Sequence, residues 1–508
     1  MNMHAVNGGT AVEAPEETEP ARDALLRRRG EMIAEGPRPP RPRTARRRAE
    51  ALCDEGSFAE LDPFRRARPS GYAAVKARDG DGVVTGWGTI SGRPVVVVAH
   101  DFSFAGGSIG AVFAEKITRA QRLALERRCP IVYLNDSGGA RIHEGIEALH
   151  GCGQIMALNV AARRTIPQIS VILGPCAGAA AYSPALTDWT IMVAGRSQMF
   201  LTGPEVVRAA TGERIDPESL GGAALHARES GVAHLEASDE DEALAAARRL
   251  LSYVPQAAGA DLLERLPAPP PPARVAALPD IVPAHPGTPF DMRSLLAGIL
   301  DAGVLFELMP GVGQSLLTGL ARLDGVPVGV VASQPARRGG ILDARTATKG
   351  ARFVEFCGRF GLPIVTLVDV PGFMPGSAEE RRGVITHGAA LLAAYVDAAV
   401  PKLTVIVRKA YGGAYIAMGS RSLGAAHTWA WPGAEIAVMG PEAAVGLLHR
   451  RELATATDPQ AERRTLAAKY RATVTSPFVA AEAGVIDEVI LPEETRTRLV
   501  AALRLALS

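Results

Sequence analysis

Four glycine-containing turns directly follow apolar runs that have the length of buried strands. They read NDSGGAR (135–141), GPCAGAA (174–180), VDVPGFM (368–374) and KAYGGAY (409–415). A strand, a tight turn and then a helix leave backbone N–H groups exposed. The spacing matches neither GxGxxG nor GxxxxGK[ST], so the nucleotide-binding fingerprints are not met. Two convergent turns can instead place two N–H donors around one oxygen, as an oxyanion hole does for a carbonyl that becomes negative during reaction.

Small residues suit such a site because a larger side chain would fill the space that a substrate must occupy. The second turn of each pair also opens a helix, whose dipole adds positive potential there. The alternative is that these glycines only form tight junctions between strands and helices. A single turn favours this alternative, whereas four turns in two matched pairs favour an oxyanion hole in each pair.

The turns recur because the chain repeats itself. TGWGTISGRPVVVVA (85–99) matches TGLARLDGVPVGVVA (318–332), and IPQISVILGPCAGAA (166–180) matches VPKLTVIVRKAYGGA (400–414) at nearly the same offset. Short apolar strands alternate with Ala-rich amphipathic stretches, which predicts an α/β fold with strands buried on both faces. We therefore expect two copies of one domain, each of about 200 residues.

The composition is that of a globular protein. The 508 residues are 47% hydrophobic with a formal net charge of +1, so no overall field recruits nucleic acid or an anionic membrane. The five cysteines show no CxxC spacing, which disfavours a disulfide framework and a zinc site, and we expect no metal. Neither a signal peptide nor an apolar stretch long enough to span a bilayer is evident, so a cytoplasmic location is expected.

Composition also suggests the domain boundaries. Residues 1–20 are expected to form a disordered tail, and 264–289, which contains Pro269 to Pro272, an interdomain linker. The expected domains are 21–275 and 285–508. Residues 21–48 carry ten arginines and three acidic residues, and a solvated arm containing a helix is favoured there over a nucleic-acid patch.

From about residue 45 to about residue 490, the sequence resembles the carboxyltransferase β subunit of biotin-dependent acyl-CoA carboxylases, the propionyl-/acetyl-CoA carboxylase group. The motifs that carry the resemblance are GDGVVTGWGTISGRP, DFSFAGGSIG, DSGGARIHEG, IPQISVILGPCAGAAAYSPALTD, LGGAALHARESGVAH, VDVPGFMPG, RKAYGGAYIAMGS and AWPGAEIAVMGPEAAVGLLHRRE. The resemblance implies tandem duplicated crotonase-like domains, each a ββα superhelix. It also implies transfer of CO2 from carboxybiotin to the α-carbon of a short acyl-CoA.

The resemblance assigns a substrate to each copy. In the N-terminal copy, the turns would bind the thioester oxygen of acyl-CoA through Gly138, Gly139, Ala140, Gly178 and Ala179. In the C-terminal copy, Gly413 and Ala414 would bind the ureido oxygen of biotin. Gly372, Phe373, Gly412, Tyr415 and Ile416 would contact the substrates there.

The resemblance also implies partner chains. The active site would lie between subunits of a homo-oligomer, usually a hexamer built as a trimer of dimers. No biotinyl-lysine context appears among the six lysines, and no ATP-grasp segment is found. Biotin must therefore arrive on a partner biotin carboxylase or biotin carboxyl carrier subunit.

Departures from the family pattern concern both copies. Ala179 stands where a second glycine is usual, and His143 where glutamine is usual. Thr386 and His387 occupy a position that commonly carries a basic residue. Ile416 stands where relatives selective for propionyl-CoA often have Asp, so acetyl-CoA or broader use is expected unless Ile416 only packs in the core.

Other functions remain open at this stage. A biotin-dependent decarboxylase subunit would use the same site in the reverse direction. A biotin-independent crotonase-type hydratase or hydrolase would need acid–base residues, for which His143 and Glu144 are candidates. Asp136, Asp369 and His387 also lie beside turns, where capping is the commoner role. A non-catalytic scaffold subunit would not need intact turns.

Overall fold

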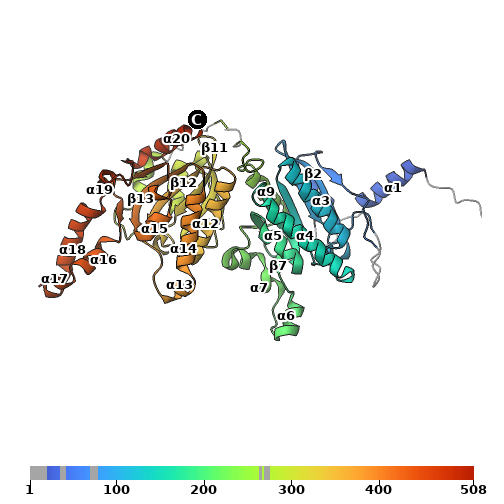
Figure 1. Cartoon of the computed structure of the whole chain (residues 1–508), viewed down its shortest axis with the longest axis horizontal. Coiled ribbons are helices and arrows are strands. Elements are labelled where there is room, and N and C mark those ends of the chain that lie inside the picture. The colour runs from blue at the N-terminus through green and yellow to red at the C-terminus, as the bar shows by residue number, and fades with distance from the viewer. Residues whose placement is uncertain (1–19, 35–41, 69–77, 262–265, 268–274) are drawn as a thin grey trace, which may run out of the picture.

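The computed structural model describes residues 20–34, 42–68, 78–261, 266–267 and 275–508. The expected tail lies outside these residues except for residue 20, and so does the central part of the expected linker, 268–274. Two αβ units lie side by side in Figure 1, the N-terminal unit in blue and green and the C-terminal unit in yellow to red.

Each unit is built on one eight-stranded sheet, and the two sheets have the same strand order. In the first, β1-β2-β3-β4-β5-β6-β8 are hydrogen-bonded in that order and β7 pairs with β5; the second runs β9-β10-β11-β12-β13-β14-β16, with β15 paired to β13. The first sheet contains β1 (Ala59–Leu61), β2 (Val83–Ile90), β3 (Arg93–His100), β4 (Ile131–Ser137), β5 (Gln168–Ala177), β6 (Trp189–Val193), β7 (Gln198–Phe200) and β8 (Leu235–Ala237). The second contains β9 (Phe306–Leu308), β10 (Leu316–Leu323), β11 (Val326–Ser333), β12 (Ile364–Val370), β13 (Lys402–Tyr411), β14 (His427–Ala430), β15 (Glu435–Ala437) and β16 (Glu488–Val489). The predicted duplication is confirmed.

The strands from β3 to β8 and from β11 to β16 are parallel. The central strands β4 and β12 are buried at every residue, as the unbroken apolar runs predicted. Helices cover both faces of each sheet. In the N-terminal unit these are α3 (Ala111–Arg127) and α4 (Ile146–Ala162) on one face, and α2 (Ala45–Leu52) and α9 (Glu240–Leu251) on the other. Their counterparts are α12 (Ala344–Arg359) and α14 (Val384–Asp397), with α11 (Met292–Ile299) and α20 (Thr495–Leu507) opposite.

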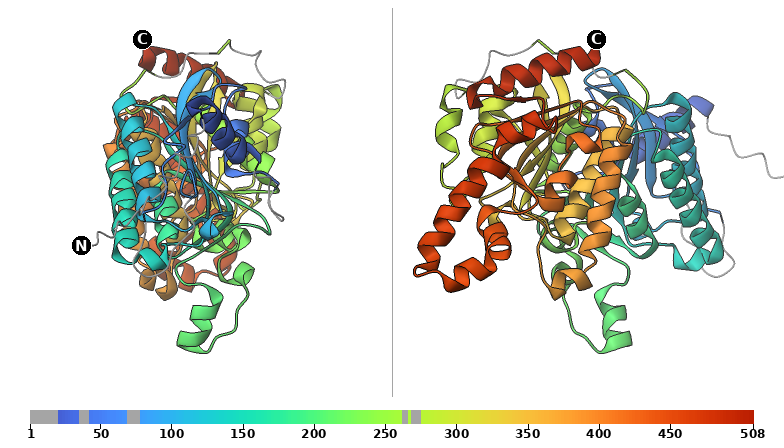
Figure 2. Two further views of the ribbon diagram at one scale, coloured as in Figure 1. Left: turned by 90° about the vertical axis from the view of Figure 1, so that its right-hand side faces the viewer. Right: turned by 60° about the vertical axis from the view of Figure 1, so that its left-hand side comes forward.

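Several helices lie outside these layers. In Figure 2, α6 and the group α16 to α18 extend away from the two sheets. The remaining helices are α1 (Ala21–Ala34), α5 (Tyr182–Leu186), α6 (Pro204–Thr211), α7 (Pro217–Gly221), α8 (Ala223–Leu225), α10 (Leu278–Ile281), α13 (Ser377–Arg381), α15 (Gly412–Ala417), α16 (Pro441–Leu448), α17 (Arg450–Thr455), α18 (Pro459–Tyr470) and α19 (Pro477–Glu482). In the part of the chain that the structure describes, none of the helices combines the length and the apolar character of a membrane span.

The two units share one apolar core. The ring of Trp189 on β6 lies 4.6 Å from that of Phe356 on α12, in an edge-to-face arrangement. Beside it, Asp188 forms an ion pair with Arg359 at 2.9 Å. The N–H of Met309 donates to the carbonyl of His234 at 2.8 Å, so backbone atoms also connect the units. The copies are therefore held as one body.

His234 makes this interface sensitive to acid. It is buried against Trp189, and its Nδ1 accepts a hydrogen bond from the N–H of Thr190 at 3.0 Å, so the ring is neutral. Burial lowers the pKa of His234 to about 3. Between this value and the unfolded pKa of about 6.5, only the unfolded state binds the proton, so stability falls as pH falls through this range.

We therefore expect the His234→Gln variant, whose side-chain oxygen can still accept from Thr190, to lose less stability on acidification than wild type. Between pH 6.5 and pH 5 the difference should be about 1.7 kcal/mol, because the slope rises from half of its full value of about 1.4 kcal/mol per pH unit as the unfolded histidine becomes protonated. Urea unfolding at the two pH values measures it. Equal losses in the two proteins would show that His234 does not titrate with unfolding.

The expected helix in the arginine-rich arm is confirmed as α2, which ends at Leu52. The expectation of a solvated arm is wrong for Arg48, which is buried and paired with acidic side chains. All five cysteines are buried and carry free thiols.

Candidate active site

The turns lie at the carboxyl ends of neighbouring parallel strands. In the N-terminal unit, Ser137 at the end of β4 is paired with Cys176 near the end of β5. A Cβ added at Gly139 would lie 2.9 Å from the carbonyl oxygen of Ala177, so the two turns are in contact. In the C-terminal unit, Val370 is paired with Ala410 in the same way. The tertiary structure thus brings together both predicted pairs of turns.

The N–H groups of the first N-terminal turn differ in whether they already donate a hydrogen bond within the protein. The N–H of Gly138 donates to the carbonyl of Gly106 at 2.9 Å, and that of Gly139 donates to Ser137 Oγ at 3.2 Å. The N–H of Ala140 has no acceptor among the described residues, although a backbone bridge to Ile109 holds its neighbours on either side. Ala140 therefore carries the available donor of this turn.

The second N-terminal turn continues into the 3-10 helix η3 (Gly178–Ala181). Gly178 adopts a positive φ of 58°, which favours glycine at this position. Ala179 follows as the second residue of the helix, where a helix offers no internal acceptor to an N–H group. The N–H groups of Ala140 and Ala179 are thus the candidate pair.

The C-terminal unit repeats this arrangement. Pro371 has no N–H, and a backbone bridge between Leu342 and Phe373 leaves the Phe373 N–H without an acceptor in the described structure. Gly412 starts α15 with a positive φ of 59°. Gly413 follows with ordinary backbone geometry, and a Cβ added there would have no heavy atom within 4 Å beyond its chain neighbours. Phe373 and Gly413 are the candidate pair here, and Ala414 lies one residue further along the helix.

The two remaining predicted contact residues lie on α15. Tyr415 packs against the core, its hydroxyl is buried without a hydrogen-bond partner among the described residues, and burial raises its pKa. Ile416 is 42% exposed and is therefore not the core residue that the packing alternative required.

An arginine that the sequence reading passed over braces the first N-terminal turn. Arg141 is fully buried, and its guanidinium bonds to Asp81 at 2.7 Å and to Glu144 at 2.8 Å. Glu144 also accepts from the N–H of Ala111 at 2.7 Å, at the start of α3. Glu144 is thus engaged in holding the turn and is not free for acid–base work.

The other acid–base candidates are engaged as well, with one exception. Asp136 and Asp369 are fully buried and paired with arginines. His387 Nδ1 lies 2.9 Å from the hydroxyl of Thr348. His143 Nε2 is buried without a hydrogen-bond partner in the described part of the chain. No carboxylate among these candidates is available beside the N–H pairs.

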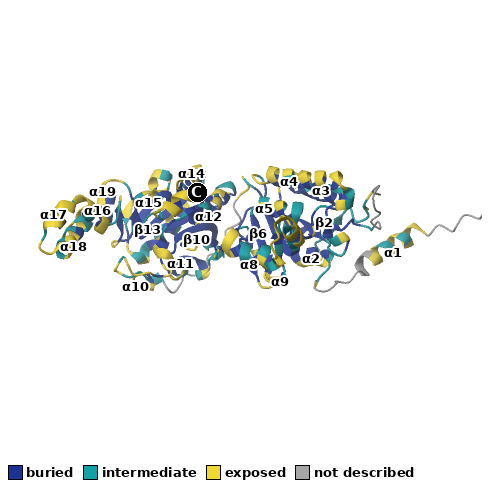
Figure 3. Cartoon of the chain, turned by 90° about the horizontal axis from the view of Figure 1, so that it is seen from below, coloured by how far each residue is buried: buried dark blue, intermediate teal, exposed yellow. Residues whose placement is uncertain are grey.

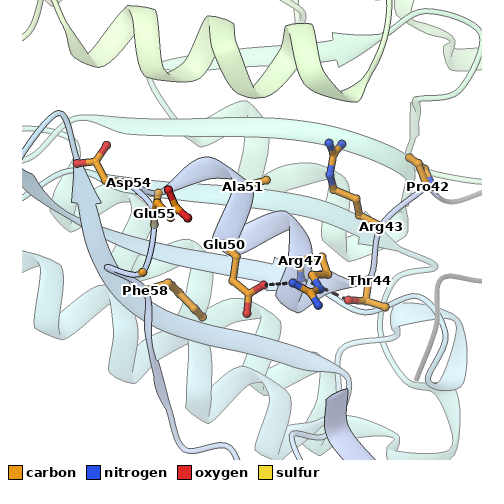
Figure 4. Close-up of a pocket in the computed structure, with 11 residues that line it drawn as sticks. Pro42, Arg43, Thr44, Arg47, Glu50, Ala51, Asp54, Glu55 and Phe58 are labelled. Atoms are coloured by element: carbon orange, nitrogen blue, oxygen red, sulfur yellow. Dashed lines mark hydrogen bonds and ion pairs between the residues drawn. The ribbon is translucent and has the colours of Figure 1, made fainter. Parts of the chain in front are cut away.

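A cavity of about 740 Å³ lies elsewhere, against the outer side of α2 (Figure 4). Its lining residues all fall between Pro42 and Phe58, and none comes from the four turns. The candidate active site is therefore not this cavity.

The fold and the site define a class of enzyme, the carboxyltransferase built from tandem crotonase-like domains. Residues 40–508 match the family model described as carboxyl transferase domain. The chain belongs to this family, that of the carboxyltransferase β subunits of biotin-dependent acyl-CoA carboxylases, as the sequence motifs predicted.

Individual relatives are similar over nearly their whole lengths. The propionyl-CoA carboxylase carboxyltransferase subunit of Haloferax mediterranei is 49% identical over 91% of this chain and 90% of its own. The methylmalonyl-CoA decarboxylase subunit alpha of Veillonella parvula is 46% identical, covering 92% and 90%. The hexameric transcarboxylase 12S, solved with methylmalonyl-coenzyme A and methylmalonic acid bound, matches with a TM-score of 0.86 and 43% identity, covering 94% and 91%.

Proposed function

We propose that the chain is the carboxyltransferase subunit of an acyl-CoA carboxylase. It transfers CO2 from carboxybiotin, carried by a partner chain, to the α-carbon of a short acyl-CoA and gives a malonyl-CoA-type product. The observation that best supports this function is a pair of N–H groups at the same place in each copy, Ala140 with Ala179 and Phe373 with Gly413.

The N-terminal pair would hold the thioester oxygen of acyl-CoA. As the α-proton leaves, charge develops on this oxygen, and one such donor stabilises it by about 2.7–4 kcal/mol. The C-terminal pair would hold the ureido oxygen of biotin in the same way. Carboxybiotin supplies CO2 and, once CO2 has left, a ureido nitrogen basic enough to take the α-proton.

This division of labour agrees with the side chains around the turns. Asp136, Asp369 and Glu144 are all engaged in ion pairs, so they are not placed to take a proton from substrate. A biotin-independent hydratase or hydrolase would need such a group, and of the candidates only His143, whose Nε2 has no hydrogen-bond partner among the described residues, is left to supply it. That function is therefore less well supported than carboxyl transfer.

The reverse reaction, decarboxylation of a malonyl-CoA-type substrate, would use the same N–H pairs. The relative from Veillonella parvula named as a decarboxylase subunit keeps this possibility open. The partner decides the direction: a biotin carboxylase subunit drives carboxylation, whereas a membrane decarboxylase subunit drives the reverse.

The test is a transfer assay with the purified chain. A biotinylated carrier and its biotin carboxylase, supplied with ATP and radiolabelled bicarbonate, are combined with acetyl-, propionyl- and butyryl-CoA. We expect labelled carboxyacyl-CoA only when the chain and the carrier are both present. Absence of product with every acyl-CoA, although the carrier itself becomes carboxylated, would refute the function.

The position of Ile416 leads to a prediction about the length of the acyl chain that the site accepts. An apolar side chain there would set the depth of the pocket by bulk alone, and a methylene in such a pocket is worth about 1–3 kcal/mol, or roughly 10–200-fold in kcat/KM. We expect wild type to accept acetyl-CoA and at least one longer acyl-CoA, and Ile416→Asp to shift use towards propionyl-CoA, as the family pattern implies. The measurement is the kcat/KM ratio for the two substrates with one carrier. A ratio unchanged within about twofold would show that Ile416 does not set the choice of acyl-CoA.

We further propose a homo-oligomer, a hexamer built from dimers, with residues 264–289 linking the two domains. Exposed apolar side chains on α4 and α14 support this assembly, and the two helices lie along the same side of the molecule in Figure 3. Ile146 and Leu149 on α4 are 75% and 54% exposed, and Ile385 on α14 is 74% exposed. Exposed apolar side chains that gather on one face mark interaction sites.

A further inference from the structure

A buried aspartate occupies the same place in both copies, at the end of the strand that leads into the first turn. The pairing of β4 with β5 shifts register between Asn135 and Ser137, and that of β12 with β13 between Val368 and Val370. The residues at these irregularities are Asp136 and Asp369. A bulge re-aims the end of a strand, so these aspartates lie where the direction of each first turn is set.

In the C-terminal copy, the neighbouring strand itself binds the aspartate. Asp369 Oδ2 accepts from the guanidinium of Arg408 at 2.8 and 3.2 Å, and Oδ1 accepts from the N–H of Lys409 at 3.0 Å. The other end of the Arg408 guanidinium, Nη1, donates to the carbonyls of Pro283, His285 and Thr288. Arg408 thus ties the first turn to the segment through which the chain enters the domain.

The N-terminal copy cannot use this arrangement. Gly174 stands where Arg408 would be, and Pro175 where Lys409 would be. A Cβ added at Gly174 would lie only 2.2 Å from Asp136 Oδ1, and proline has no N–H to donate. Gly174 and Pro175 therefore cannot give Asp136 the guanidinium and the N–H that Arg408 and Lys409 give Asp369.

Arg48 on α2 supplies the missing cation from another part of the chain. Its Nη1 donates to Asp136 Oδ2 at 2.9 Å, and its Nε donates to Glu240 Oε2 at 3.2 Å, at the start of α9. All three side chains are buried. As in the other copy, a guanidinium joins the aspartate to the segment that enters the domain, although here the entering segment carries the arginine.

The helix α2 is built to present Arg48 inward. Thr44 caps its first turn by accepting from the N–H of Arg47. Arg47 and Glu50 line the open cavity of Figure 4 and bond to each other there, whereas Ala45, Ala49 and Leu52 are buried on the same side as Arg48. Neighbouring arginines of one short helix thus have opposite surroundings.

We infer that Arg48 and Arg408 are positioning residues, each of which holds the aspartate that directs the first turn of its own half of the active site. This inference rests on the proposed function, in which the N-terminal turns bind acyl-CoA and the C-terminal turns bind biotin. Removing either guanidinium takes the compensating cation away from a buried aspartate, which is strongly unfavourable, so the turn is expected to rearrange until the carboxylate reaches water.

The test compares Arg48→Met with Arg47→Met, its exposed neighbour on the same helix. A misplacement of about 1 Å at a reacting centre lowers the rate about 100-fold, so we expect the kcat/KM of Arg48→Met for acyl-CoA to fall by about that factor. The KM for acyl-CoA should rise, whereas the KM for the biotin carrier should stay within about twofold of wild type. Arg408→Met should show the opposite split, with a raised KM for the carrier. Arg47→Met should resemble wild type in both constants.

A merely structural role would lower the amount of active enzyme and leave both KM values unchanged, which would overturn the inference. Equal effects of Arg48→Met and Arg47→Met would overturn it too. Should Arg48→Met fail to fold, Arg48→Lys keeps the charge but cannot reach both acids through separate nitrogens, and it should show the same KM split at a smaller size.

Amide hydrogen exchange separates this inference from the proposed function. We expect faster exchange in residues 136–141 of Arg48→Met, and not of Arg47→Met, whether or not any acyl-CoA is carboxylated. Unchanged exchange there would overturn the positioning role even if wild type is an active carboxyltransferase.

Discussion

Replacing Gly413 with valine is expected to abolish carboxyl transfer and to leave the free energy of unfolding close to that of wild type. Gly413 has ordinary backbone geometry, and an added Cβ has no heavy atom within 4 Å apart from those of its chain neighbours and of the backbone of its own helix, so the described structure can accommodate the side chain. The added bulk instead occupies the space beside the Phe373 and Gly413 N–H groups, where biotin would bind. The loss of one such donor costs about 100- to 1000-fold in turnover, and a blocked pocket should cost at least as much.

The matched control is Gly433→Val. Gly433 also has open space around an added Cβ and ordinary backbone geometry, but it lies in the turn between β14 and β15. Transfer rates and urea unfolding are measured for both variants. Unchanged turnover in Gly413→Val would remove Gly413 from the site, and a matching loss in Gly433→Val would show that the effect is not specific to the turn.

Chains that cannot associate are expected to have no transfer activity, because each half of the active site would be completed by another chain. The double variant Ile146→Lys with Ile385→Lys places charges on the exposed apolar side chains of α4 and α14. Both side chains are largely exposed in the single chain, so the fold should tolerate the change, whereas an interface would have to bury two lysines. We expect sedimentation to show monomers and the transfer assay to show no product.

Leu505→Lys is the control, since Leu505 is 68% exposed on α20, on another helix. It should remain an active oligomer. A monomeric double variant that still transfers CO2 would contradict the shared site, and a double variant that remains an oligomer would contradict the placement of the interface on α4 and α14.

Local pattern was enough to predict much of this molecule. Apolar runs such as PIVYLND and ISVILG predicted buried strands of an α/β unit, and the repeated motifs predicted the same unit twice. The four turns could also be found from local pattern, because glycine directly after an apolar run indicates a tight turn. The motifs also carried the family resemblance, which the family model confirms.

What the sequence determined by itself is therefore the two-copy α/β fold, the alternation of strands with amphipathic stretches, the positions of the turns and the family. The tertiary structure decided that the N–H of Gly138 is not available, because folding brings the carbonyl of Gly106 close to it, whereas Gly139 donates to its near neighbour Ser137. It also decided that Arg48 faces inward while Arg47 faces solvent, and that Asp136 receives its cation from α2. The conformation of a backbone turn depends on its own residues. A buried charge instead needs an oppositely charged group nearby, and that group can come from any part of the chain that packs against it, so its position in the sequence cannot be predicted from the turn.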